Sequence, residues 1–248
     1  MSRPEAARFF GERAQWYDAG YDKVTSDGHA ARARLETVAS VVGSGPGELL
    51  DAGMGAGRLC DHLSRLGWSV SGVDAAEEMV ATARTRLPKA SDRLVVGLIE
   101  ELPFADESFD AVTATGVLEY SDVPRALAEL ERVLRPGARA VVSYPNPRAV
   151  YGVWKTQVYY RAVRSAKKIL GRPHGMPRGA GRIPPERFFE LLVAAGLRPT
   201  GVRFSSFLIV PSPIDIAFAR ASARIGEALE GRAPTWLATQ VVYSARKP

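Results

Sequence analysis

The sequence predicts an α/β fold: a doubly wound, mostly parallel sheet of seven strands with helices on both faces, an antiparallel last strand and a helical lid insert. Three observations predict it. Of the 248 residues, 46% are hydrophobic and 24% are charged, as in ordinary globular proteins. Short apolar runs alternate with amphipathic helices between residues 48 and 146, which indicates strand–helix–strand units with parallel strands. A glycine-rich turn also follows the first apolar run.

The elements follow in order along the chain. The first forty-odd residues are expected to be helical and amphipathic. Short strands are predicted over residues 48–51, 68–73, 94–96, 109–114 and 138–144. Helices are predicted between them, with apolar residues at three- and four-residue steps, over residues 59–66, 79–87 and 126–134. Pro136 and Gly137 indicate a turn into the fifth strand.

The regular alternation stops after Asn146 and resumes with a helix over residues 185–195. Two further strand candidates, 202–210 and 240–245, are expected to pair in antiparallel fashion at one edge of the sheet. We therefore divide the chain into an N-terminal helical cap (1–45), a cofactor-binding core (46–147), a basic helical insert or lid (148–184) and the rest of the core (185–248).

Strand polarity alone predicts one binding site. Parallel sheets bind ligands outside the carboxyl ends of their strands. This puts five segments along one rim: 51–57, Asp74, 98–104, 115–122 and 144–147.

The glycines at 53, 55 and 57 let the backbone turn sharply and approach a ligand closely. Alone they are a weak signal, since a tight turn without a ligand also needs one or two glycines. A dinucleotide fingerprint needs a third glycine where this chain has Arg58. Asp51 would repel a pyrophosphate but suits a cationic ligand that carries an ammonium group.

At 49–57, LLDAGMGAG resembles motif I of the class I S-adenosylmethionine-dependent methyltransferases. Further blocks are similar to that family in order and spacing: VSGVD at 70–74, GLIEELPF with DESFD at 97–110, TGVLEY at 115–120 and LRPG at 134–137. The resemblance covers residues 48–146. It implies a Rossmann-like core, S-adenosyl-L-methionine as the cofactor and S-adenosyl-L-homocysteine as the product.

The resemblance also implies roles for residues at the methionine end of the cofactor. Asp51 would position the amino group, and Gly53 and Gly55 would pass beneath the cofactor. Thr115 or Gly116 would lie under the methionine chain. The family's N-terminal tyrosine, which closes over the carboxylate, is matched by Tyr17 or Tyr21.

At the nucleoside end, the resemblance implies that Asp74 takes the ribose hydroxyls and that Met79 packs on the adenine. Ile99 would offer its backbone N–H to the ring. The family's usual acid is replaced by Leu98, so either Glu100 substitutes or the adenine amino group meets water. Asp74 could instead form an Asx turn, and Met79 could simply fill the core.

The acceptor is less defined by the sequence. The segment after the fourth strand lacks the Asp/Asn-Pro-Pro-Tyr/Phe motif of nucleic-acid amino methyltransferases, so no nucleic-acid partner is expected. The nearest resemblance is to small-molecule and quinone O-methyltransferases, which implies transfer to a hydroxyl of a small lipophilic or glycosylated molecule. The alternatives are N-methylation of a natural-product or sugar amine, a non-catalytic cofactor-binding or membrane-docking module, and a nicotinamide oxidoreductase.

A hydroxyl acceptor calls for a general base. His174 and Glu119 rank first, ahead of His29, His62 and Tyr144. Glu119 could instead be a solvated acid at the start of the next helix. No cluster of residues has metal-ligand spacing, so we expect no metal.

Positive charge is concentrated in one segment. Residues 148–187 hold ten Lys/Arg and one acid, whereas the rest of the chain holds 23 Lys/Arg and 26 Asp/Glu. Within 148–172, one side of a helical wheel is aromatic and aliphatic and the other is basic. This pattern predicts either peripheral contact with an anionic membrane or a lid helix packed on the body.

The single cysteine, Cys60, and the absence of an apolar run of 18 residues bear on location. No intrachain disulfide can form, and no segment is apolar for long enough to span a bilayer. A cytoplasmic location is expected, with the inner face of the membrane as the alternative.

Overall fold

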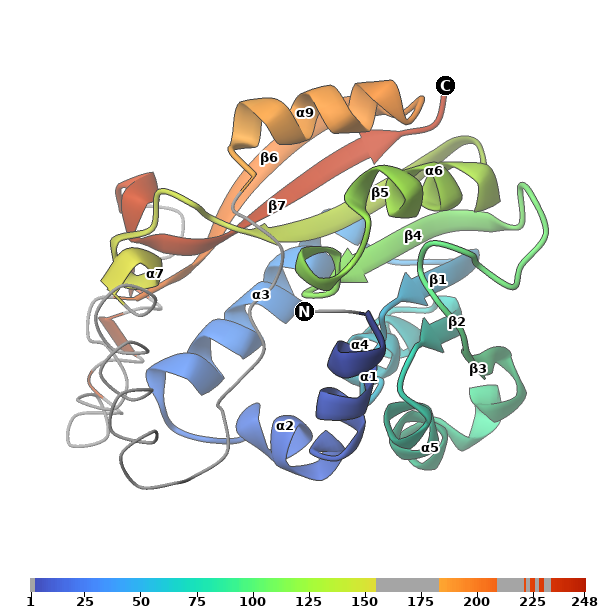
Figure 1. Cartoon of the computed structure of the whole chain (residues 1–248), viewed down its shortest axis with the longest axis horizontal. Coiled ribbons are helices and arrows are strands. Elements are labelled where there is room, and N and C mark those ends of the chain that lie inside the picture. Colours follow the sequence, from blue (N-terminus) through green and yellow to red (C-terminus); the bar gives the residue numbers. More distant parts are fainter. Residues whose placement is uncertain (1–2, 155–182, 209–220, 222–223, 226–227, 230–232) are drawn as a thin grey trace.

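A computed structural model describes residues 3–154, 183–208, 221, 224–225, 228–229 and 233–248. Its centre is a seven-stranded sheet with the order β3-β2-β1-β4-β5-β7-β6. The strands are β1 (Glu48–Ala52), β2 (Ser69–Asp74), β3 (Leu94–Val96), β4 (Phe109–Thr115), β5 (Leu134–Pro145), β6 (Arg198–Phe207) and β7 (Ala238–Arg246). The first five strands pair in parallel, and β7 runs antiparallel between β5 and β6 (Figure 1). The predicted fold class is confirmed.

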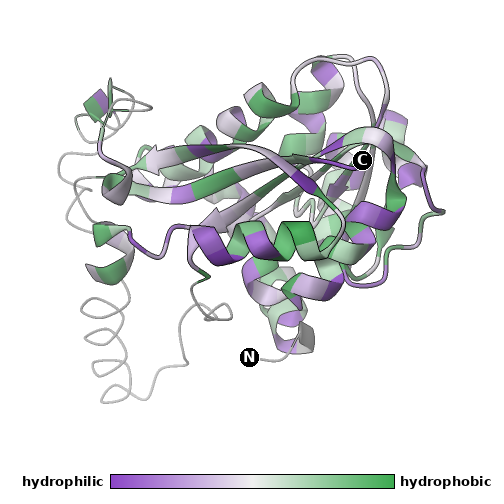
Figure 2. Cartoon of the chain, turned by 90° about the horizontal axis from the view of Figure 1, so that it is seen from above, coloured by the Kyte–Doolittle hydropathy of each residue, from purple (hydrophilic) through white to green (hydrophobic). Residues whose placement is uncertain are grey.

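Helices cover both faces of this sheet (Figure 2). The described helices are α1 (Arg3–Gly11), α2 (Ala14–Gly20), α3 (Ser26–Val42), α4 (Arg58–Arg65), α5 (Glu77–Arg86), α6 (Val123–Val133), α7 (Val150–Trp154) and α9 (Pro185–Ala194), with short 3-10 helices η1 (Pro88–Arg93), η2 (Leu118–Tyr120) and η5 (Thr235–Leu237). None of the described helices is long and apolar enough to cross a membrane.

Two hydrophobic cores fix these layers. On one face, Leu127 and Leu130 of α6 and Phe188 of α9 pack against inward side chains of the sheet. On the other face, Val38 and Val42 of α3 join side chains of α4 and α5. Each strand residue contributes to one face or the other because side chains alternate along a strand.

Two strands start four residues before their predicted first residues, whereas the other strand bounds within the described residues differ by at most three residues. β5 starts at Leu134, four residues earlier than predicted, because Leu134 already pairs with Phe109 of β4. The predicted turn at 134–137 lies within β5, and the register of the two strands shifts there, between Phe109 and Ala111. β6 starts at Arg198 rather than Val202. Its first half is largely exposed, as suits an edge strand, and so lacks the apolar alternation that predicts strands.

The division into cap, core, insert and remainder is not tested by these observations and stays a prediction. Most of the basic insert, residues 155–182, lies outside the described residues, and so does His174.

Candidate functional site

The glycine turn after β1 is held from behind by β2. The Val73 carbonyl accepts hydrogen bonds from the N–H groups of Gly53 (2.7 Å) and Met54 (3.0 Å). The turn then ends at Gly57, and α4 starts at Arg58. The backbone is thereby bent across the carboxyl ends of two adjacent strands.

Two glycines in this turn are required for different reasons. Gly53 has φ +78°, and a Cβ there would lie 2.6 Å from the Cβ of Val117, which is too close. Gly55 has φ +54°, but a Cβ there would meet no atom within 4 Å. The backbone at Gly55 therefore faces open space, as a turn beneath a ligand must.

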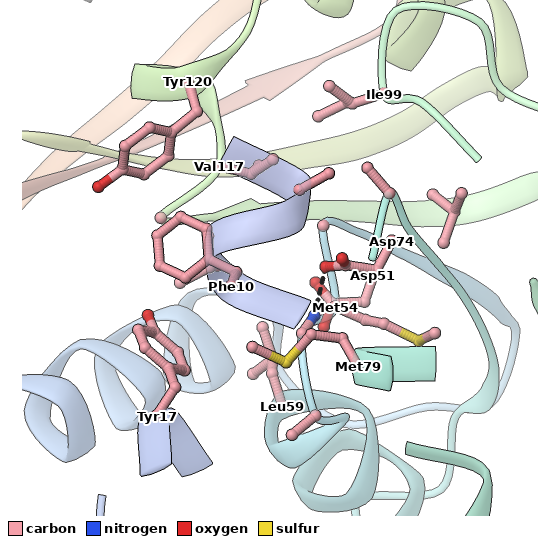
Figure 3. A pocket seen from close by; sticks show the side chains of 18 of the residues that line it. Phe10, Tyr17, Asp51, Met54, Leu59, Asp74, Met79, Ile99, Val117 and Tyr120 are labelled. Atoms are coloured by element: carbon pink, nitrogen blue, oxygen red, sulfur yellow. Dashed lines mark hydrogen bonds between the residues drawn. The ribbon is translucent and has the colours of Figure 1, made fainter. Parts of the chain in front are cut away.

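A pocket opens above this turn (Figure 3). Among the residues that line it are all eleven predicted to bind the cofactor, namely Tyr17, Tyr21, Asp51, Gly53, Gly55, Asp74, Met79, Ile99, Glu100, Thr115 and Gly116. The structure thus brings together residues from the N-terminal helices and from the ends of β1, β2 and β4, while their individual roles remain predictions.

Asp74, at the end of β2, organises the rim. One carboxylate oxygen accepts a hydrogen bond from Gly55 N–H (2.9 Å), and the other accepts from Ala76 N–H (2.9 Å). The Asx-type arrangement weighed from sequence is therefore present. It leaves lone pairs free for a ligand, because each carboxylate oxygen can accept two hydrogen bonds. Burial raises the pKa of Asp74, and the backbone hydrogen bonds oppose that rise.

Asp51 is almost fully buried at the end of β1. Its carboxylate accepts hydrogen bonds from Thr113 Oγ1 (2.7 Å) and Cys60 Sγ (3.6 Å). Burial raises the pKa of Asp51 to about 6, although both hydrogen bonds favour the charged form. A buried carboxylate of this kind is stabilised when an ammonium group binds beside it.

The opposite end of the pocket is less polar. Glu100 lines it, but one of its carboxylate oxygens accepts a hydrogen bond from Asp122 N–H (2.9 Å). Leu98, which stands where the resemblance leads us to expect an acid, lines the pocket and is 40% exposed. Met79 both lines the pocket and belongs to a small core with Ala76, so the two interpretations of that residue are compatible.

The sequence did not single out Arg34, which also lines the pocket. Its guanidinium lies 3.2 Å from the position that a Cβ on Gly116 would take, and its Nη2 donates to the Tyr21 hydroxyl at 3.4 Å. A signal was available: its neighbours four residues away, Ala30 and Val38, are apolar. A cation on that face of a helix points to an anionic partner.

An ion-pair network fastens the N-terminal helices to the glycine turn. Arg58, at the start of α4, pairs with Asp18 (2.6 Å) and with Asp22 (2.6 Å). Asp18 also pairs with Arg86 (2.8 Å), whose guanidinium reaches the Ala56 carbonyl in the turn. Helix α2 is thereby clamped over the pocket, and sequence periodicity gave no sign of these pairings.

Glu119 is not a solvated acid, and that interpretation is wrong. Glu119 belongs to η2, and α6 starts only at Val123, where Asp122 accepts from Arg125 N–H as the cap. Glu119 Oε2 is buried without a hydrogen-bond partner. Burial raises the pKa of this carboxyl, and the nearby Arg34 guanidinium opposes the rise.

The other candidate bases are placed differently. His29 on α3 is buried, and His62 lies on α4, the helix that follows the glycine turn; like Glu119, neither is among the residues that line the pocket. Burial and then Glu119 raise the pKa of Tyr144 to about 12. Within the described part of the chain, no three His, Cys, Asp or Glu residues are grouped to hold a metal ion.

Known proteins are similar to this chain in sequence and in fold. A methyltransferase-domain family model matches residues 50–142. A demethylmenaquinone methyltransferase of Thermus thermophilus is 34% identical over 202 residues, which cover 75% of this chain and 90% of that protein. The chain is a class I S-adenosylmethionine-dependent methyltransferase.

Two further comparisons agree with this family. A demethylmenaquinone methyltransferase of Mycobacterium sp. (strain KMS) is 36% identical to this chain over 176 residues, which cover 68% of this chain and 73% of the relative. The solved structure of a methyltransferase from Thermotoga maritima superposes with a TM-score of 0.68 at 21% identity, covering 97% of this chain and 99% of that chain. The family excludes the nicotinamide oxidoreductase and the non-catalytic module as interpretations.

The pocket of the methyltransferase fits its cofactor, S-adenosylmethionine. The open side of Gly55 admits the chain of the ligand, and the buried carboxylate of Asp51 suits its ammonium group. Asp74 has acceptor capacity for a diol, and Arg34 supplies a cation for a carboxylate. When bound, the cofactor supplies an electrophilic methyl group on a sulfonium.

Proposed function

We propose that the methyltransferase acts on a hydroxyl of a small, lipophilic acceptor and that Glu119 is the general base. The observation that carries this proposal is the buried, unpartnered Oε2 of Glu119. Glu119 lies just beyond the end of β4, three residues after Gly116 of the pocket. Its neighbours Val117 and Tyr120 line the pocket, although Glu119 itself is not among the lining residues.

The electrostatics of Glu119 suit a base. Burial raises the pKa of its carboxyl, and a carboxylate with a raised pKa takes a proton more readily than an ordinary one. The nearby Arg34 guanidinium opposes this rise. Tyr21, then burial and, to a smaller extent, Glu119 raise the pKa of Tyr17, so these groups lie near one another.

The lining of the pocket supports a lipophilic acceptor. Phe10 contacts Tyr17 and Tyr120 edge to face, with ring centroids 5.5 Å and 5.3 Å apart. Leu35 and Val117 line the same pocket. The names of the curated relatives add that demethylmenaquinone is the acceptor of those proteins.

Methyl transfer to the acceptor would be a single displacement reaction in which Glu119, Arg34 and the aromatic side chains have separate roles. The acceptor O–H would donate to Glu119 Oε2, which takes the proton as the oxygen bonds to the methyl carbon. The cofactor, which Asp51 and Asp74 would hold, would supply the methyl group from its sulfonium and keep the electron pair of the carbon–sulfur bond. Arg34 and the aromatic side chains of Phe10, Tyr17 and Tyr120 would exclude water and align the reactants.

Methyl transfer to a ring carbon is a second candidate, favoured by the names of the relatives. When a hydroxyl on an aromatic ring loses its proton, the negative charge spreads to the adjacent carbons. The same base could therefore direct the methyl group to oxygen or to carbon.

Labelled cofactor and a lipid extract test the proposal. We expect a labelled lipophilic product whose methyl group is an ether in the first case and a ring methyl in the second. Glu119→Gln should lower kcat by about 10²- to 10⁴-fold, the usual contribution of a general base. The exposed Glu101→Gln is the matched control. Full activity of the Glu119 variant, or transfer to an acceptor lacking a hydroxyl, contradicts the proposal.

The roles of residues 148–172 and of His174 stay predictions. The basic insert is proposed to touch an anionic membrane, and His174 is proposed as a further base, but residues 155–182 lie outside the described part of the chain.

A further inference from the structure

Asp51 is the most buried of the acids that line the pocket, with 1% of its surface exposed. A carboxylate without partners in such a place would give up its charge by taking a proton. Among the described residues, the groups that shift the pKa of Asp51 include no cation. Neutral hydrogen-bond donors are therefore what keeps this carboxyl ionised until an ammonium group binds beside it.

Two donors reach Asp51, one for each carboxylate oxygen. Thr113 Oγ1 donates to Oδ1 at 2.7 Å, and Cys60 Sγ donates to Oδ2 at 3.6 Å. A short hydrogen bond from a hydroxyl to a charged oxygen is strong, whereas a thiol is a weak donor. Thr113 therefore contributes the larger share of the stabilisation and Cys60 the smaller.

The sheet register brings Thr113 beside Asp51. The two residues are directly opposite each other in the parallel pair of β1 and β4, so their side chains leave the sheet on the same face. On the other side of β1, the residue opposite Asp51 is Gly72, which has no side chain. Cys60 belongs to the first turn of α4, which packs on that face. The donors around Asp51 are thus fixed by one neighbouring strand and one helix.

The protons of both donors are available to Asp51. The second acceptor near Thr113 Oγ1 is the Leu50 carbonyl at 3.5 Å, which is much farther away than the Asp51 oxygen. Burial and then the charge of Asp51 raise the pKa of Cys60, so the thiol keeps its proton. Thr113 and Cys60 are fully buried, and neither is among the residues that line the pocket. They can therefore influence a ligand only through Asp51.

We infer that Thr113 and Cys60 are positioning residues for the cofactor, whose two donors keep the Asp51 carboxylate ionised and in one orientation for the ammonium group. This inference rests on the predicted contact between Asp51 and that group, and it does not depend on the acceptor. Each carboxylate oxygen can accept two hydrogen bonds, so one place on each oxygen remains for the ligand.

The two donors act against burial and against Asp74. Burial raises the pKa of Asp51 most, the hydrogen bonds from Thr113 and Cys60 lower it, and the charge of Asp74 raises it slightly. The result is a pKa of about 6. Loss of either donor should raise that pKa further, and the affinity for the ligand should then fall at a higher pH.

The test follows the Kd of S-adenosylhomocysteine by calorimetry from about pH 5 to about pH 8. In the unmodified chain we expect the affinity to rise with a midpoint at about 6. Thr113→Val keeps the shape of the side chain but removes the hydroxyl, so the midpoint should move up by about 1–2 pH units. The affinity should fall about tenfold at pH 6 and much less at pH 8. Thr113→Ser keeps the hydroxyl and should restore the original midpoint.

Three controls separate positioning from general damage. 5′-Methylthioadenosine has the same nucleoside but no ammonium group, so its affinity should be equal in all variants and should not follow this pH profile. Thr37→Val, the same substitution at a hydroxyl bonded to Ser205, should leave the midpoint unchanged. Cys60→Ala should raise the midpoint by less than Thr113→Val does, and this variant keeps the test valid if Thr113→Val does not fold.

The outcomes that overturn the inference are distinct. An unchanged midpoint in Thr113→Val or in Cys60→Ala contradicts it. Equal losses of affinity for S-adenosylhomocysteine and 5′-methylthioadenosine in Thr113→Val would show a purely structural role. A flat pH profile in the unmodified chain would overturn the inference together with the role of Asp51 itself.

Discussion

The Asp74 carboxylate accepts a hydrogen bond of 2.9 Å from the Gly55 N–H, so the acid that ends β2 fixes the glycine turn that follows β1. One side chain thereby shapes the floor of the pocket and offers its remaining lone pairs to the ligand. The two functions can be separated by mutation.

Asp74→Asn keeps one acceptor oxygen, whereas Asp74→Ala removes both. We expect Asp74→Ala to weaken S-adenosylhomocysteine by about 1–3 kcal/mol, and Asp74→Asn to have a smaller effect. Calorimetry measures the affinities, and thermal unfolding shows whether the turn itself has been lost. Unchanged affinity in both variants would refute the ribose assignment.

Gly53→Ala and Gly55→Ala should lower the free energy of unfolding by different amounts. The Cβ at position 53 would meet Val117, so we expect a loss of about 1–3 kcal/mol in the free energy of unfolding, partly restored by adding Val117→Ala. At position 55 a Cβ meets nothing, so the protein should lose only about 1 kcal/mol for its positive φ.

The same pair is then compared for cofactor binding. Gly55→Ala should abolish most of the S-adenosylhomocysteine affinity, because the added methyl group enters the space reserved for the ligand. If Gly55→Ala binds like the unmodified chain, the ligand does not pass over this turn.

Asp51 predicts a pH dependence of binding. Its pKa is raised to about 6 in the folded protein, so the carboxyl is protonated at lower pH and has no charge to offer an ammonium group. S-adenosylhomocysteine affinity should therefore rise with pH up to about 6 and level off above it, with proton release below pH 6. Calorimetry in buffers of different ionisation enthalpy measures both, and Asp51→Asn should flatten the profile.

The same pKa sets the direction of the stability change. Since the folded-state pKa lies above the ordinary value of 3.8, the folded protein binds the proton more tightly than the unfolded chain. The contribution of Asp51 to the free energy of unfolding should fall as pH rises from about 4 to 6 and stay constant above that. An increase over this window in the chain, but not in Asp51→Asn, would contradict the assignment.

The basic segment 148–172 predicts binding to anionic vesicles. We expect the protein to co-sediment with vesicles containing an anionic phospholipid at low salt and to be released as salt increases, because exposed charge is screened. Neutral vesicles are the control. No pelleting at low salt removes membrane contact from consideration.

Much of the fold could be predicted because the strands are short, buried and separated by helices of regular period. The same reasoning missed the first four residues of β6, where exposed positions such as Arg198 and Thr200 carry no apolar alternation. It also placed a turn at 134–137, because a bulge inside a strand has the same Pro-Gly composition as a turn between elements.

Some residues of the site could be predicted from the sequence and others could not. The glycines, Asp51 and Asp74 follow strands directly, so strand polarity places them on one rim. Arg34 lies on α3 and not at a strand end, so strand polarity says nothing of it, although its apolar neighbours Ala30 and Val38 were a signal.

The pairing of Asp18 with both Arg58 and Arg86 has a kinetic consequence. Tyr17 and Asp18 of α2 line the pocket, so ion pairs that hold this helix in place should also slow the departure of the spent nucleoside. Arg58→Met should therefore speed the dissociation of S-adenosylhomocysteine in stopped-flow measurements, whereas Arg65→Met, which breaks an exposed pair, should not. Turnover in this enzyme would then quicken with ionic strength whenever product departure is the slowest event.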